Sequence, residues 1–211
     1  LYVRSSLERA NESRREMEAV NVKLLKQSET DQMTGLANRY RLNAYSEKVL
    51  DYCYEHRLPL AMEILDIDFF KQYNDNYGHQ QGDECIIAIA NELKKMEDGQ
   101  TFCARYGGDE FIIIYAGISA EEVHAKAGAL RQNIMNLKLE HLYSKALPIV
   151  TISQGISYGV PEEGNRSWDF LHTADMLLYQ VKKRSRNDIC IADIRGQELD
   201  LSSKQGGRGL R

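Results

Sequence analysis

The sequence lacks the features that define several common classes of protein. Its four cysteines are scattered, with no C-x-x-C pair and no Cys/His cluster. This spacing argues against a structural zinc site and is typical of reduced thiols in a cytoplasmic protein. No apolar stretch is long enough to span a bilayer, and the 211 residues contain no secretory signal. A Walker-type G-x-x-x-x-G-K-[ST] sequence is also absent, which excludes a P-loop NTPase.

The chain also lacks a strong net charge. It carries −4 overall, with 43% hydrophobic and 27% charged residues, an ordinary balance for a soluble globular chain. This charge offers no electrostatic basis for binding nucleic acid, or for direct contact of this fragment with an anionic membrane. An anionic substrate would therefore need local compensation from a metal ion or from a few placed Lys and Arg.

Residues 1–29 differ in pattern from the rest of the chain. They contain no Gly or Pro, and five apolar residues follow alternating four- and three-residue steps, with Arg14 and Asn21 in the remaining slots: Val3, Leu7, Ala10, Met17 and Leu24. This heptad pattern predicts a helical, coiled-coil-like stalk that dimerises, in preference to a solvated helix packed on its own domain. Because the helical pattern is already under way at residue 1, we expect a fragment of a longer protein, whose parent chain could be anchored in a membrane.

Residues 30–195 are expected to form one α/β domain, followed by a flexible tail at 196–211. The patterns predict a helix at 40–56, a strand at 58–68, a short helix and loop at 69–83, a helix at 84–96, strands at 101–106 and 110–116, a helix at 119–139, a strand at 146–159, a helix at 167–185 and a strand at 187–193. Ser119 with Glu122 is placed for a capping box, and Ser167 is expected to cap the last helix. This order favours an α/β sandwich of the split βαβ type, with a central mixed sheet flanked by helices.

Carboxylates stand at the ends of two expected strands. Asp66 and Asp68 end the first strand and share a face, because residues i and i+2 of a strand point the same way. Asp109 and Glu110 follow the paired glycines Gly107–Gly108. If the two strand ends are neighbours, these acids converge, and oxygen ligands without His or Cys select Mg²⁺ or Mn²⁺. Solubilising acids beside an ordinary G-G hairpin are the plainer alternative for either pair alone, but the two pairs together favour a site.

Three cations could balance a bound polyphosphate. Lys71 follows the first acidic strand end by one helical turn, and Lys182 and Arg186 are i, i+4 neighbours near the end of the last helix. From spacing alone, a structural role at the helix C-terminus is the more favoured interpretation for Lys182 and Arg186.

Four stretches occur in one order: "DQMTGLANR", "DIDFFKQYNDNYGHQQGDE", "RYGGDEF" and "ADMLLYQVKKRSRND". Together they resemble the diguanylate cyclase (GGDEF) domain family over roughly residues 30–195. The resemblance implies a palm-like α/β sandwich that condenses two GTP into cyclic di-GMP and pyrophosphate, each 3′-OH attacking the other nucleotide's α-phosphate. It also implies two Mg²⁺ or Mn²⁺ ions per active site. The resemblance further implies a homodimer, because each domain of the family binds one GTP.

The resemblance also assigns roles to individual residues. The metal ligands would be Asp66, the carbonyl of Ile67, Asp109 and Glu110, and the last two are the candidates for proton removal. The residues expected to bind GTP are Phe69, Phe70, Lys71, Asn74, His79, Asp83, Gly107, Gly108, Lys182 and Arg186. Among them, Asn74 and Asp83 would bind the guanine edge. A carboxylate accepts from N1–H and the 2-amino group, which favours guanine over adenine.

Where the family carries an Arg-x-x-Asp product-inhibition motif, this chain has Asp98-Gly99-Gln100-Thr101, which predicts that it has no inhibitory product site. Residues 166–169 spell the same pattern in the wrong place. A catalytically silent GTP-binding or dimerisation module is the alternative function, although such modules usually have a damaged hairpin and this one is whole. A cyclase that makes a different dinucleotide is disfavoured by Asp83.

Overall fold

The computed structural model describes Arg14 and residues 29–199. The stalk predicted at residues 1–29, apart from Arg14 and Glu29, and most of the tail predicted at 196–211 lie outside the described residues. The elements in chain order are α2 (Arg39–His56), β1 (Leu60–Ile67), α3 (Phe70–Tyr77), α4 (His79–Lys94), β2 (Thr101–Gly107), β3 (Glu110–Ala116), α5 (Ala120–Asn136), β4 (Ile152–Gly159), α6 (Ser167–Arg184) and β5 (Ile189–Asp193).

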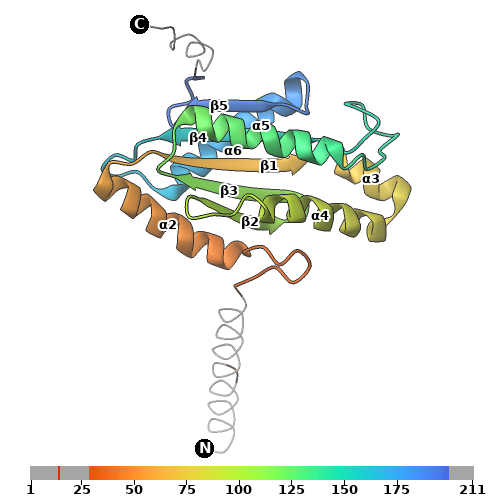
Figure 1. Cartoon of the computed structure of the whole chain (residues 1–211), viewed down its shortest axis with the longest axis horizontal. Coiled ribbons are helices and arrows are strands. Elements are labelled where there is room, and N and C mark those ends of the chain that lie inside the picture. Colours follow the sequence, from red (N-terminus) through yellow and green to blue (C-terminus); the bar gives the residue numbers. More distant parts are fainter. Residues whose placement is uncertain (1–13, 15–28, 200–211) are drawn as a thin grey trace, which may run out of the picture.

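Five strands form one mixed sheet in the order β2-β3-β1-β4-β5 (Figure 1). β1 runs antiparallel to β3 and β4, and β2 and β3 form an antiparallel hairpin, whereas β4 and β5 run parallel. The predicted α/β sandwich around a central mixed sheet is therefore confirmed. The register between β1 and β3 places Asp66 directly opposite Glu110.

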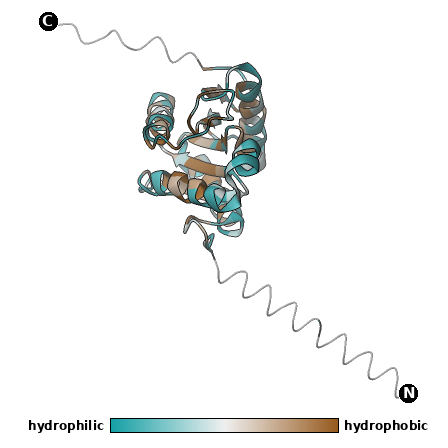
Figure 2. Cartoon of the chain, turned by 90° about the vertical axis from the view of Figure 1, so that its right-hand side faces the viewer, coloured by the Kyte–Doolittle hydropathy of each residue, from teal (hydrophilic) through white to brown (hydrophobic). Residues whose placement is uncertain are grey.

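The alternation of side chains along β1 divides the interior into two apolar layers. Leu65 and Ile67 join a cluster with residues of α4 and α5, and Leu60 and Met62 join a second cluster with residues of α2. Figure 2 shows hydrophobic strands between helices that carry both hydrophilic and hydrophobic residues. Because successive side chains point to opposite faces, Asp66 falls on the face that α2 and α6 cover.

α6 lies directly against β4 because Gly155 has no side chain. A Cβ atom on Gly155 would lie 2.2 Å from the carbonyl oxygen of Ala174 and 2.3 Å from the backbone nitrogen of Leu178. A larger residue would force the helix away from the sheet. This close approach positions the end of α6, from which Lys182 reaches Asp66 on β1.

A short helix and loop were predicted at 69–83 and a helix at 84–96, but the boundary between them is wrong. α4 begins at His79, immediately after Gly78 ends α3. Gly82 continues the helix and lies against Asn74 and Phe70 of α3. This tertiary contact outweighs the weak helix propensity of the stretch.

One predicted helix cap is confirmed and the other is wrong. Ser119 and Glu122 form the expected capping box at the start of α5. At α6 the N-cap residue is Arg166, whose N–H donates to Asp169 Oδ2 at 2.8 Å. Ser167 is already the first helical residue, and its hydroxyl donates to Glu47 on α2.

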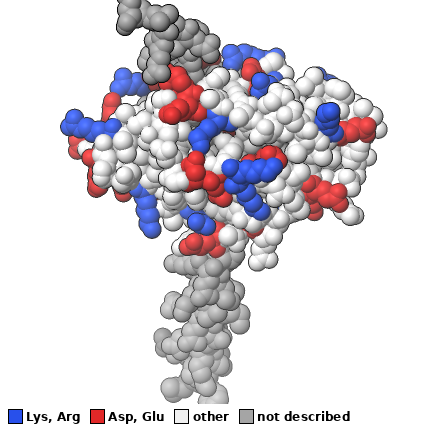
Figure 3. Space-filling view, in the orientation of Figure 1, with Lys and Arg blue, Asp and Glu red and all other residues white. Residues whose placement is uncertain are grey.

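The surface carries mixed charge, and Figure 3 shows acidic and basic side chains interspersed over the face in view. Within residues 29–199, no helix combines the length and the apolar character that crossing a membrane requires. The four cysteines are free and buried. After β5 the chain turns back, so that Glu198 bridges to Ala192 and the Leu199 N–H donates to the Ile191 carbonyl at 3.2 Å.

Candidate active site

Asp66, Glu110 and Lys182 meet at one end of the central strand. Asp66 is the penultimate residue of β1, and its partner Glu110 is the first residue of β3. The Nζ atom of Lys182 lies 2.8 Å from Asp66 Oδ2. The pairing of β1 with β3 therefore brings the two acidic strand ends together, and α6 adds a cation.

The charges at this end of the sheet are strongly coupled. The pKa of Asp66 is raised from 3.8 to about 6: burial is the main cause, Lys182 opposes the rise, and Asp109 and Glu110 add to it. Burial likewise raises the pKa of Glu110, which Lys182 lowers and Asp109 and Asp175 raise. Like charges this close disfavour ionisation of one another. The cluster therefore favours the binding of positive charge, which Lys182 supplies in this structure.

The glycine hairpin leaves open space beside the acids. Gly108 adopts a left-handed φ of 54°, and Gly107 has a φ of 159°, close to extended. A Cβ atom on either glycine would meet nothing within 4 Å among the described residues. Asp109 is half-buried in the turn that follows. A ligand can thus approach the hairpin backbone closely.

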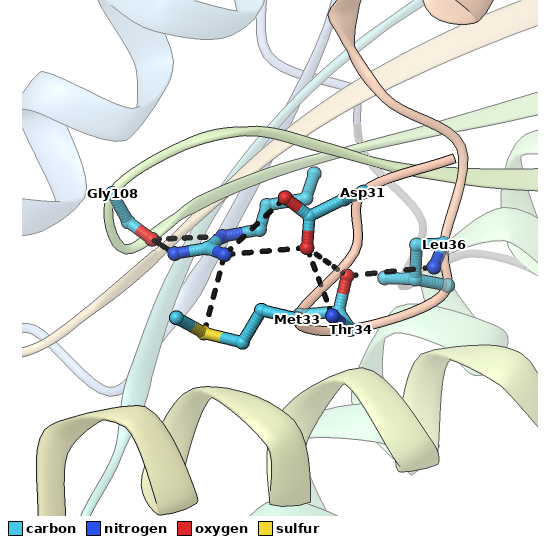
Figure 4. A network of polar contacts seen from close by, with 6 residues as sticks. Asp31, Met33, Thr34, Leu36 and Gly108 are labelled. Atoms are coloured by element: carbon cyan, nitrogen blue, oxygen red, sulfur yellow. Dashed lines mark hydrogen bonds and ion pairs between the residues drawn. The ribbon is translucent and has the colours of Figure 1, made fainter. Parts of the chain in front are cut away.

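Arg105 ties the hairpin to the segment before α2 through contacts with Gly108 and Asp31, both of which are labelled in Figure 4. Its Nη2 and Nε atoms donate to the Gly108 carbonyl at 2.8 and 3.1 Å, and its Nη1 lies 3.2 Å from Asp31 Oδ1. Asp31 also accepts from the N–H and the hydroxyl of Thr34, at 2.9 and 2.7 Å. Burial raises the pKa of Asp31, but Thr34 and Arg105 outweigh burial and the net pKa is lowered. The sequence analysis assigned no functional role to Arg105 or Asp31. The only indication was that each residue lies in one of the stretches that resemble the family.

Asp68 is fully buried and already has a complete set of partners. Its carboxylate accepts from the hydroxyls of Thr151 and Ser153, at 2.8 and 2.6 Å, and from the Asn187 N–H at 2.9 Å. Arg186 Nη1 lies 3.7 Å from Asp68 Oδ1. Asp68 therefore connects β1 to β4 and to the chain after α6. The strand pattern placed Asp66 and Asp68 on one face, but it could not show that only Asp66 faces the hairpin acids.

The turn after β1 brings further predicted residues to the same place. The guanidinium carbon of Arg186 lies 4.3 Å from the ring centroid of Phe69, an arrangement typical of a cation–π contact. Phe69 is the N-cap residue of α3 and Phe70 its first residue. The Ile67 side chain is buried in the core. The Ile67 side chain is therefore not available to a ligand.

The remaining predicted GTP ligands lie on α3 and α4. Lys71, His79 and Asp83 are exposed. Asn74 is half-buried, and its Oδ1 atom is buried with no hydrogen-bond partner in the described part of the chain. A Cβ atom on Gly82 would lie 1.8 Å from that oxygen, so the glycine makes room for the amide. An unpaired buried amide oxygen is a group that a bound ligand or water can satisfy.

The acids suit a hard cation, although they do not form a closed cage. Among residues 29–199, no three His, Cys, Asp or Glu side chains gather closely enough to hold a metal ion by themselves. Asp66, Asp109 and Glu110 nevertheless offer only oxygen atoms, and their negative charges raise the pKa of Asp66. This donor set fits Mg²⁺ or Mn²⁺.

A hollow of about 260 Å³ adjoins the acids. It is lined by residues of β3 and α6: Glu110, Asp175, Met176, Leu178, Tyr179 and Lys182. Glu110 and Lys182 are thus accessible from the α6 side of the sheet.

Comparison with known proteins places the chain in a family. Residues 28–188 match the family model described as "Diguanylate cyclase, GGDEF domain". The chain therefore belongs to the GGDEF diguanylate cyclase family, as the sequence resemblance indicated.

Individual relatives agree with this assignment. The chain is 35% identical over 163 residues to the probable diguanylate cyclase DgcC of Escherichia coli, covering 76% of this chain and 42% of that protein. It is 33% identical over 190 residues to the diguanylate cyclase DgcP of Pseudomonas aeruginosa, covering 88% and 28%. The chain thus spans less than half the length of these curated relatives. The GGDEF domain of DgcB from Caulobacter crescentus, solved in complex with c-di-GMP, has a TM-score of 0.71 and 29% identity, covering 78% of this chain and 93% of that one.

Proposed function

We propose that this chain condenses two GTP molecules into cyclic di-GMP and pyrophosphate as a homodimer. The observation that carries the proposal is the position of Asp66 opposite Glu110, with Lys182 2.8 Å from Asp66 Oδ2, beside an open glycine hairpin. Membership of the family, and relatives named as diguanylate cyclases, support the same reaction.

Cations and backbone N–H groups at this end of the sheet would hold the triphosphate. Lys182 and Arg186 reach the site from the end of α6, and Lys71 is exposed in the first turn of α3. The first N–H groups of a helix lack intrahelical acceptors and bind anions well. Phe69 and Phe70 are therefore placed to donate to phosphate oxygens, while Gly107–Gly108 leaves clearance for them.

Residues of α3 and α4 would recognise the base. The carboxylate of Asp83 can accept from guanine N1–H and the 2-amino group, and the unpaired amide of Asn74 offers a further hydrogen bond. His79, exposed at the start of α4, would lie near the base or the ribose. Adenine lacks these donors and would leave the acceptors unpaired, which is costly.

Asp66, the Ile67 carbonyl, Asp109 and Glu110 would hold two Mg²⁺ or Mn²⁺ ions. Such ions lower the pKa of a hydroxyl and neutralise charge on phosphoryl oxygens. One of Asp109 and Glu110 would accept the proton of the 3′-OH. The pH–rate profiles of Asp109→Asn and Glu110→Gln, compared with that of the unmodified chain, assign the proton to one of them.

The reaction joins two nucleotides, and each domain binds one, so two copies must face each other. The proposal includes no contact with nucleic acid and no direct membrane contact by this fragment. The four buried free thiols support a reducing compartment such as the cytoplasm.

The test is a GTP assay with Mg²⁺ or Mn²⁺ across a series of protein concentrations. We expect cyclic di-GMP, with a specific activity that rises as the dimer forms. Asp109→Asn should lower the rate at least about 100-fold without unfolding the chain. Asp51→Asn, on the exposed surface of α2, is the matched control and should keep full activity.

Two outcomes would contradict the proposal. A confirmed dimer that binds GTP and makes no product would identify a silent GTP-binding module. Mixed dinucleotides formed from GTP and ATP together would identify a cyclase of different specificity.

A further inference from the structure

Phe69 has an unfavourable backbone conformation where the central strand meets α3. Its φ of 56° and ψ of 31° lie in the left-handed region, which a residue with a side chain rarely adopts. Such a conformation persists only where surrounding contacts hold it. Arg186 stacks on the Phe69 ring, and a second contact holds the Phe69 backbone.

That second contact comes from His141, in the loop between α5 and β4. Its Nε2 atom lies 3.1 Å from the Phe69 carbonyl oxygen, and the residue is completely buried. A carbonyl oxygen can only accept a hydrogen bond, so Nε2 carries a proton. In the neutral ring, Nδ1 is then unprotonated and holds a lone pair. Nδ1 has no hydrogen-bond partner among the described residues. Burial lowers the pKa of His141, which favours this neutral form.

The same loop holds α3 at both ends. The His141 ring meets Tyr73 edge-on, with centroids 5.2 Å apart at 86°. The next residue, Leu142, donates its N–H to the Tyr77 hydroxyl at 3.0 Å. His141 also donates its own N–H to the Pro148 carbonyl at 3.0 Å, which fixes the loop.

We propose that His141 is a positioning residue for GTP: it holds the Phe69 carbonyl and so sets the direction of the N–H groups at the start of α3. That the bound anion is GTP rests on the proposed function. That His141 fixes the turn at Phe69 does not. His141 lies outside the four stretches that carry the family resemblance, and it acts on the nucleotide only through Phe69.

Three variants separate this role from simple packing. His141→Phe keeps a flat ring against Tyr73 and removes both nitrogens. His141→Gln can place its amide nitrogen near the position of Nε2, whereas the shorter His141→Asn cannot. His124→Phe is the control, because His124 is exposed on α5.

One measurement needs no ligand. The Tyr73 N–H donates to the Phe69 carbonyl at 3.0 Å, so its hydrogen exchange reports on the turn. We expect His141→Phe and His141→Asn to lower the protection of this amide about 10-fold or more, and His141→Gln to restore most of it.

The second measurement concerns the nucleotide. We expect the KM for GTP, and the Kd for a non-hydrolysable GTP analogue with Mg²⁺, to rise about 10-fold in His141→Phe with a smaller change in kcat. His141→Gln should recover the affinity, and His124→Phe should leave it unchanged.

The outcomes distinguish the inference from the proposed function. If the unmodified chain makes no cyclic di-GMP, the proposed function fails, while Tyr73 exchange and analogue binding still decide the role of His141. Unchanged protection and affinity in His141→Phe would overturn the inference. So would a loss in all three variants that merely follows their Tm, with no recovery in His141→Gln.

Discussion

The Lys182 ammonium lies 2.8 Å from Asp66 Oδ2, so the cation at the end of α6 is paired with the central acid of the candidate site. Spacing along the sequence favoured a structural role for Lys182 at the helix C-terminus. The structure gives it a carboxylate partner whose other neighbours, Asp109 and Glu110, are negative. Removal of Lys182 would leave Asp66 partly buried among like charges, and this is costly.

We expect Lys182→Met to destabilise the chain in a pH-dependent way. The folded pKa of Asp66, about 6, is above its ordinary value of 3.8, so the folded state loses stability as pH rises between these values. Without Lys182 the folded pKa rises further. At pH 8 we expect the free energy of unfolding to fall by about 1–3 kcal/mol, and at pH 5, where the carboxyl holds its proton, by much less.

Urea denaturation at the two pH values measures this difference. Lys183→Met is the control, because Lys183 is exposed on the same helix and stacks on Tyr179 instead. An equal loss of stability at pH 5 and pH 8 would show that the Lys182 charge does not act through Asp66.

A second prediction compares two ion pairs of the segment before α2. Asp31 faces the nearly buried Arg105, whereas Glu29 lies 3.8 Å from Arg41 and both of these side chains are about half exposed. We expect Asp31→Asn to lower the free energy of unfolding by about 1–2 kcal/mol. Glu29→Gln should cost less than about 0.5 kcal/mol.

Asp31→Asn should also slow GTP turnover several-fold, because Arg105 holds the Gly108 carbonyl next to Asp109. Urea melts and initial rates at saturating GTP measure both effects. Equal behaviour of the Asp31 and Glu29 variants would show that the charge of Asp31 is not needed to hold Arg105.

The third prediction concerns Glu63, a completely buried acid on the face opposite the site. Its carboxyl group accepts from the Tyr115 hydroxyl and from Gln154 Nε2, each at 2.7 Å. Burial raises its pKa from 4.5 to about 7, against the lowering by these two bonds. The folded state therefore holds this proton longer than the unfolded state, and stability should fall by about 3 kcal/mol as pH rises from 4.5 to 7.

Unfolding curves of the unmodified chain and of Glu63→Gln, recorded from pH 4 to pH 8, isolate this effect. Titration of Asp66 changes the stability of both proteins equally, so it cancels when their pH profiles are subtracted. In Glu63→Gln, the free energy of unfolding should fall much less steeply between pH 4.5 and 7 than in the unmodified chain. Parallel pH profiles would mean that Glu63 titrates in the folded chain as it does in the unfolded one.

The fourth prediction concerns a glycine beside the proposed base-binding residues. A Cβ atom on Gly82 would lie 1.8 Å from Asn74 Oδ1, so Gly82→Ala must displace the Asn74 side chain. We expect the KM for GTP to rise about 10-fold with a modest fall in Tm. Gly99→Ala is the control, because a Cβ there meets nothing within 4 Å. If the two variants bind GTP equally well, Asn74 does not contact the base.

Much of the fold could be predicted from the local pattern of apolar and polar residues. Periodicity of 2 and 3.6 residues located each strand and helix, and the alternation along β1 placed Asp66 on a definite face. The boundary errors include residues 146–151, which were predicted as strand although β4 begins only at Ile152, and they also include residues 79–83 and Ser167. At residues 79–83, the packing of Gly82 against Asn74 determined the structure, and at Ser167 a hydrogen bond to Glu47 did so. Local composition was not decisive at either place.

By itself, the sequence determined the order of elements, the two acidic strand ends and the family. The tertiary structure alone decided that β3 is the neighbour of β1, which sets Asp66 opposite Glu110. It also decided that the Asp68 carboxylate accepts a hydrogen bond from Ser153 of β4. In the same way it brought Arg105 and His141 to partners 74 and 72 residues away in the chain. The reason is physical: periodicity reports which way a side chain points within its own element, whereas strand pairing and close packing decide what it meets there.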